Sequence, residues 1–171
     1  VGASGLGTEV RFRIDKRRAI LASVTLKGTV AALATTNTGG GETIEYVDDL
    51  AFNIWNRNTG WAVYEGGSDN VIERRTPDEM YLLLQHAMDE DEIAYEYDNI
   101  LGGMSTADRR TAAASAQTFY LNLAHYSDVL ASKVPLNRTT NGFDIVFNIA
   151  PNHTDVINTD DSIASGVSWT A

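Results

Sequence analysis

Three histidines, His86, His125 and His153, are the first residues to consider for chemistry, because imidazole serves as both metal ligand and general base. The sequence holds no further histidine and no cysteine. No two of the three stand at a spacing such as His-x-His, from which zinc sites often draw their ligands. A clustered metal site is therefore not predicted, and His86 is expected at the solvent-exposed edge of a helix.

The residues around His125 also give little support for a catalytic serine. Ser127 and Asp128 follow it closely, so a Ser–His–Asp arrangement can be drawn on paper. However, the glycines of a nucleophile elbow do not surround Ser127. The glycines at 39–41 likewise lack the Lys-Ser/Thr pair that follows a phosphate-binding loop. We predict that the protein is not an enzyme and has no catalytic residue, cofactor or metal ligand.

Two acidic runs, Asp89–Glu92 and Asp160–Asp161, carry the oxygen ligands that calcium prefers. Neither run alternates Asp or Asn with another residue, as a calcium-binding loop does. The simpler prediction is a solvated acidic surface.

Two tryptophans, Trp55 and Trp61, flank a polar turn, and Tyr64 follows closely. Aromatic platforms of this kind stack on sugars in lectins, so a carbohydrate-binding β-sandwich module is one hypothesis. The other interpretation is a cross-strand aromatic pair, which stabilises a hairpin by roughly 0.5–1 kcal/mol. Glycan binding that is lost in Trp61→Ala would distinguish the two.

The elements that must position these residues are mostly strands, because apolar residues alternate with polar ones along much of the chain. Phe119, Leu121 and Leu123 share one face, and Phe143 begins the same rhythm again after a connection of 18 residues from 125 to 142. Hairpin loops usually have two to five residues, so these two strands are not expected to form a hairpin. They are expected in different sheets of a β-sandwich. The other predicted strands are 10–14, 20–30 and a hairpin over 50–64.

One helix has a clear start signal. Thr76 is a good N-cap, Pro77 suits the first helical position, and Glu79 completes a capping box. Apolar residues at helical spacing then predict a helix that ends near Met88. A second helix is predicted over 105–116.

Charge is divided unevenly along the chain. The net charge is −10, which argues against direct nucleic-acid binding, yet residues 1–30 carry six basic and two acidic residues. A basic strand and an acidic body could interlock head to tail between copies, although a solvated strand face explains the same pattern. Aspartate outnumbers glutamate 14 to 9 and only three of the 13 basic residues are lysine, which favours a high-salt, halophilic setting.

Length predicts one domain: 171 residues suit a flexible N-terminal arm over 1–9 and a single β-domain over 10–171. Within it, three stretches appear in a characteristic order. They are Phe12–Ile20 with Val24–Val30, the predicted Leu50–Tyr64 hairpin followed by a helix, and Leu121–Leu123 with Val134–Leu136 and Phe143–Pro151.

This order resembles the jelly-roll major capsid proteins of tailless icosahedral viruses that have an internal membrane and infect bacteria or haloarchaea. The resemblance covers roughly residues 10–157 and implies the single-jelly-roll branch: an all-β sandwich with one or two short helices in its connections. It implies paired opening strands, and a closing strand over 163–169 that is self-paired or supplied by a partner.

The resemblance also implies a structural protein of the virion, whose function lies in lateral contacts rather than in a pocket. The implied partners are other capsid subunits, as homo-oligomers or with a second major capsid protein, together with an internal membrane or spike proteins. We expect neighbour contacts from the loop 31–43 and from two further groups of residues. These are Arg11, Arg13, Arg17 and Arg18 in the basic strand, and Tyr81 and Gln85 in the helix.

Overall fold

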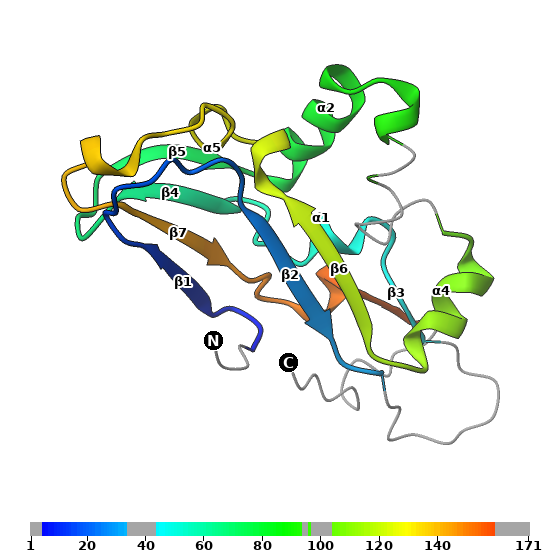
Figure 1. The fold of residues 1–171 in the computed structure, drawn as a ribbon. Helices are drawn as coiled ribbons and strands as arrows, with labels where there is room; N and C mark the ends of the chain where they lie inside the picture. Colours follow the sequence, from blue (N-terminus) through cyan, green and yellow to red (C-terminus); the bar gives the residue numbers. More distant parts are fainter. Residues whose placement is uncertain (1–4, 34–43, 94–95, 97–103, 160–171) are drawn as a thin grey trace.

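The computed structural model describes residues 5–33, 44–93, 96 and 104–159, which form mainly antiparallel strands (Figure 1). The strands are β1 (Glu9–Ile14), β2 (Thr25–Val30), β3 (Ile44–Tyr46), β4 (Trp61–Glu65), β5 (Val71–Arg75), β6 (Gln117–Asn122), β7 (Phe143–Asn148) and β8 (Ile157–Thr159). The α-helices are α1 (Leu50–Asn53), α2 (Pro77–Ala87), α4 (Thr106–Ala113) and α5 (Asp128–Ala131). Three 3₁₀ turns are η1 (Leu123–His125), η2 (Leu136–Arg138) and η3 (His153–Asp155). No helix among these residues is long and apolar enough to cross a membrane.

One layer is a four-stranded sheet in the order β1-β7-β4-β5. Strand β7 lies inside it and pairs antiparallel with β1 on one side and β4 on the other. The strands β4 and β5 form a hairpin with a register shift after Val63. Strands β1 and β5 are therefore the edges of this sheet within the described chain.

Apart from a separate short ladder of β3 with β8, the remaining strands β2 and β6 pair to form the second layer (Figure 1). Its apolar residues meet those of the four-stranded sheet in one core, where Trp55 lies between the layers. The Trp55 ring centroid is 6.4 Å from that of Phe119 on β6 and 4.8 Å from that of Phe147 on β7. The molecule is thus an all-β sandwich, as the sequence predicts.

The separation of the two late strands is confirmed. β6 pairs with β2, whereas β7 pairs with β1 and β4 in the other layer. The alternation of β6 is also confirmed, because Phe119 and Leu121 are buried while Tyr120 is 44% exposed. For β7 the prediction of one buried face is wrong, since Asp144 and Val146 are buried as well.

Both helix predictions are confirmed, with slightly shorter bounds for the second. Thr76 and Glu79 form the capping box of α2, and Ser105 accepts a hydrogen bond from the Asp108 backbone at the start of α4. Helix α2 buries Met80 and Leu84 against the core.

The predicted hairpin over 50–64 is wrong. Residues 50–53 form helix α1, in which Ile54 N–H donates to the Leu50 carbonyl at 3.0 Å. Apolar residues at i, i+2 and i+4 over only five residues fit one helical turn as well as a strand, so the pattern could not separate the two. Strand β4 instead forms its hairpin with β5.

The opening strands are not paired with each other, which is a second correction. β1 joins β7 and β2 joins β6, so the chain crosses from one layer to the other between them. The strand predicted over 20–30 is regular only from Thr25, and Ile20 makes an isolated bridge to Pro135. Most of the loop 31–43, the residues Asp160–Asp161 and the predicted closing strand over 163–169 lie outside the described residues.

Candidate functional site

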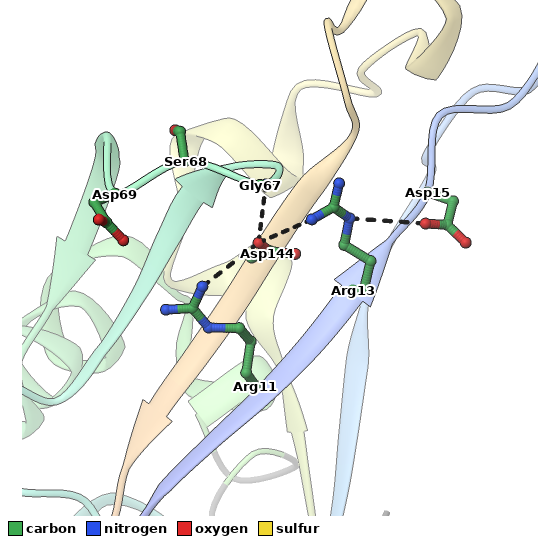
Figure 2. A pocket seen from close by; sticks show the side chains of 7 residues that line it. All are labelled: Arg11, Arg13, Asp15, Gly67, Ser68, Asp69 and Asp144. Carbon is green, nitrogen blue, oxygen red and sulfur yellow. Dashed lines mark hydrogen bonds and ion pairs between the residues drawn. The ribbon is translucent and has the colours of Figure 1, made fainter.

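One hollow of the described surface lies on the outer face of the four-stranded sheet, away from the core (Figure 2). It is open and measures about 690 Å³. Arg11 and Arg13 reach it from β1, Asp144 from β7, and the β4–β5 turn closes its other side. Its lining residues are Arg11, Arg13, Asp15, Gly67, Ser68, Asp69 and Asp144.

The centre of this hollow is the Asp144 carboxylate, whose side chain is only 3% exposed. Register places it opposite Arg13, and Arg13 Nη1 lies 3.2 Å from Asp144 Oδ2. The Gly67 backbone N–H donates to the same oxygen at 3.1 Å, and Arg11 Nη1 is 3.7 Å away. A buried carboxylate is unfavourable unless it is paired and hydrogen-bonded. These three groups meet that need at Oδ2, whereas Oδ1 is buried and accepts no hydrogen bond from a described residue.

The arginines also cover the sheet. Arg11 stands opposite Val146 in the β1–β7 ladder, and its guanidinium carbon lies 5.4 Å from the ring centroid of Tyr64 on β4. Arg11 therefore extends across β7, which explains why Val146 is fully buried on a face that has no second layer of strands. A second hydrogen bond also fixes the Arg13 side chain, because its Nη2 donates to the Asn141 carbonyl at 2.9 Å.

Chemically, this arrangement neutralises and stiffens an edge strand rather than activating a reacting group. The Arg11 and Arg13 side chains keep 42% and 41% of their surface exposed. The predicted contact residues Arg11 and Arg13 are thus brought together at one site, but much of their charge is satisfied within the chain. The motifs of the sequence do not single out Asp144; its signal is a single carboxylate within the otherwise apolar run Phe143–Phe147.

The predicted contact residues Arg17 and Arg18 differ from this pair. Together with Lys16 they form an exposed basic turn just after β1, and none of the three makes an ion pair with a described residue. The hydrophobic Ile20, 65% exposed, follows this turn.

Tyr81 and Gln85 lie one helical turn apart on the exposed side of α2. Tyr81 is 44% exposed and its neighbour Leu82 is 55% exposed, so two successive large side chains present apolar surface to solvent. This helix face is a second exposed surface, separate from the Arg11–Arg13 hollow.

Trp55 and Trp61 are core residues, with 4% and 0% of their surface exposed. Both rings pack on Phe147, at centroid distances of 4.8 and 6.0 Å, and Trp61 Nε1 donates to the Met80 sulfur. Neither tryptophan offers a free ring face on which a sugar could stack. They do not flank a hairpin turn as expected, because α1 precedes Trp55.

The histidines do not converge. His86 is exposed on α2, His153 lies in η3, and His125 Nδ1 is 2.7 Å from the buried carboxylate of Glu96. Over residues 5–33, 44–93, 96 and 104–159, no three His, Asp or Glu side chains are placed to hold a metal ion. Burial raises the pKa of Glu96, and the neighbouring His125 opposes that shift.

Ser127 has a structural role as well. Its hydroxyl donates to Glu73 Oε2 and accepts the Leu130 N–H at 3.0 Å, which caps α5. Asp128 is fully exposed at its side chain, so Ser127, His125 and Asp128 do not form a relay.

Comparison with known proteins gives one informative result. No family model matches this sequence, and no curated protein matches it. Eight chains of solved structures are similar in fold. One of them is a chain of the "PBCV-1 virus capsid, quasi-atomic model", with a TM-score of 0.52 and 12% sequence identity.

That likeness covers 99% of this chain but only 38% of the capsid chain, so this protein spans less than half the length of its structural neighbour. At this level of identity the likeness concerns the fold. The chain is an all-β sandwich of the kind found in this viral capsid.

Proposed function

We propose that this chain is a structural subunit of an icosahedral viral shell: a single jelly roll that associates with copies of itself, alone or together with a second major capsid protein, into capsomers. The observation that carries the proposal is the whole-chain likeness to a viral capsid, which extends over 99% of the sequence. The organisation of the described surface supports it, because its exposed features include a basic turn and a helix face with apolar side chains.

The finer parts of the proposal come from the sequence resemblance. The virus is of the tailless kind with an internal membrane that infects bacteria or haloarchaea, and the aspartate-rich surface suits high salt. The protein resides in the virion shell, where further contacts involve spike proteins or the membrane. Arg17, Arg18, Tyr81 and Gln85 contribute to neighbour contacts, and the exposed parts of Arg11 and Arg13 add to them.

Lateral association needs only modest contacts, because many of them close into a symmetric lattice. A standard interface buries about 1,600 Å² in total, and a shell subunit needs more than one. The edge strands β1 and β5 and the two exposed surfaces described above provide separate regions for such contacts.

The test is to size the purified protein by light scattering over a range of salt concentrations, with electron microscopy of any large species. The expected result is salt-dependent oligomers or shell fragments, and no affinity on a glycan array. A strict monomer at every salt concentration would contradict self-association. Glycan binding would favour the carbohydrate module instead, but the burial of Trp55 and Trp61 gives that alternative no support.

A further inference from the structure

Two exposed surfaces of this chain have opposite character. The basic turn comprises Lys16, Arg17 and Arg18, all exposed, and Ile20 follows at 65% exposure. Its cations make no ion pair with any other described residue, unlike Arg13, which is 3.7 Å from Asp15 and 3.2 Å from Asp144. A patch of three uncompensated cations beside an apolar side chain is suited to an acidic, partly apolar surface.

The α2 face has that character. Tyr81 and Leu82 are exposed at its centre, while Asp78 lies in its first turn and the exposed run Asp89–Glu92 follows its last turn. Within that run the Asp89 and Glu92 carboxylates accept backbone N–H groups at the start of the next helical turn. Glu90 and Asp91 are exposed as well, so the face offers apolar surface flanked by negative charge.

These two surfaces cannot meet within one chain, because they lie at opposite ends of the four-stranded sheet. The basic turn follows Ile14, which pairs with Phe143, and Phe143 pairs with Glu65 at that same end. Helix α2 follows Arg75, which pairs with Trp61 at the other end. Figure 1 shows the chain leaving β1 at the left of the view, whereas α2 stands at the upper right.

We infer that the basic turn of one copy docks on the α2 face of a second copy, as a head-to-tail contact of the proposed shell. Charge complementarity selects the partner: an exposed basic turn on one end and an acidic, apolar helix face on the other end of the same chain. Contact between different surfaces of identical subunits closes into a ring when the rotation permits it, as a capsomer requires. This inference rests on the proposed capsid function and adds the pair of surfaces that join neighbours.

The test exchanges the charges of the two surfaces. One variant carries Arg17→Glu and Arg18→Glu, and the other carries Glu90→Lys and Asp91→Lys, which leaves the capping carboxylates of Asp89 and Glu92 in place. Each variant alone brings like charges together between copies. Sedimentation velocity at low salt should show self-association weaker by about 10-fold or more in each.

Mixing the two variants supplies the decisive measurement. The acidic turn of the first then meets the basic helix face of the second, and the native turn of the second meets the native face of the first. Association should return in the mixture and weaken as salt rises, because the Debye length falls from about 10 Å at 0.1 M to about 3 Å at 1 M.

Matched controls carry the same changes in net charge elsewhere. Lys27→Glu with Ala116→Glu and Asn158→Glu matches the turn variant, and Asp128→Lys with Ala116→Lys and Asn158→Lys matches the helix variant; all four positions are exposed. Both controls should associate nearly as the wild type does, and circular dichroism should show that every variant is folded.

The outcomes separate the inference from the proposed function. If the wild type associates and the variants associate equally well, or the mixture does not recover, this contact is wrong while the capsid proposal stands. If the wild type never associates, both self-association and this contact are contradicted.

Discussion

The aromatic ring of Phe119 occupies the space above Gly28, its direct partner across the β2–β6 ladder. A Cβ atom built on Gly28 would lie 2.1 Å from Cζ of that ring. The absent side chain thus lets Phe119 lie flat against the sheet and remain 1% exposed. A glycine inside a strand often marks such a close approach.

Gly28→Ala should therefore lower the free energy of unfolding by about 1–3 kcal/mol, because the added methyl must displace a buried ring in a well-packed core. Urea unfolding followed by tryptophan fluorescence measures the change. Gly5→Ala is the matched control, since no atom lies within 4 Å of a Cβ at that position. Equal midpoints for the two variants would show that Phe119 adapts freely.

Asp144→Asn should also destabilise the protein, by about 1–3 kcal/mol, because it leaves Arg11 and Arg13 without their shared buried charge. The matched control is Asp69→Asn, which removes an exposed carboxylate from the rim of the same hollow. Denaturant unfolding of both variants provides the comparison. If Asp144→Asn is as stable as Asp69→Asn, the arginines do not depend on this charge.

Trp61→Ala should lower the free energy of unfolding by about 3–5 kcal/mol, the range for removing a large buried aromatic ring. The reason is its packing on Phe147 and its hydrogen bond to Met80. Thermal unfolding of this variant should shift strongly, whereas glycan binding should be absent both before and after the change. A stable variant that had lost a measurable sugar affinity would overturn the core assignment.

Stability should depend on pH through Glu96. Burial raises the pKa of this carboxyl above its ordinary 4.5, although the His125 charge and hydrogen bond act in the opposite direction. The folded state therefore retains a proton that the unfolded state releases. This contribution to stability is complete below about pH 4.5 and is lost as pH rises through the higher pKa of the folded state.

Glu96→Gln should remove this dependence, because the amide cannot ionise. Urea midpoints of wild type and variant between about pH 4 and pH 8 should converge at low pH and separate at higher pH, with the variant more stable there. Glu90→Gln, at an exposed position, is the control and should follow the wild type. If the urea midpoint of Glu96→Gln changes with pH as steeply as that of the wild type, a group other than Glu96 causes the pH dependence.

Patterns of neighbouring residues were sufficient to predict several helices and strands from the sequence. The capping box of Thr76 and Glu79 predicts the start of α2, because both hydrogen bonds are made within four residues. The alternation of Phe119 with Tyr120 predicts strand β6 and its buried face. The 18-residue connection before Phe143 predicts that β6 and β7 do not form a hairpin, since loop length limits which strands can be adjacent.

The amino-acid sequence by itself thus determined the class of fold, the well-capped helices and the inward face of β6, since these depend on neighbours along the chain. Only the tertiary structure decided that β1 joins β7 rather than β2, that Trp55 and Trp61 lie in the core, and that Asp144 is buried between two arginines. Strand pairing and burial depend on residues more than a hundred positions apart, such as Arg13 and Asp144. A period of two tells which side chains share a face, but the side chains that cover that face come from other strands.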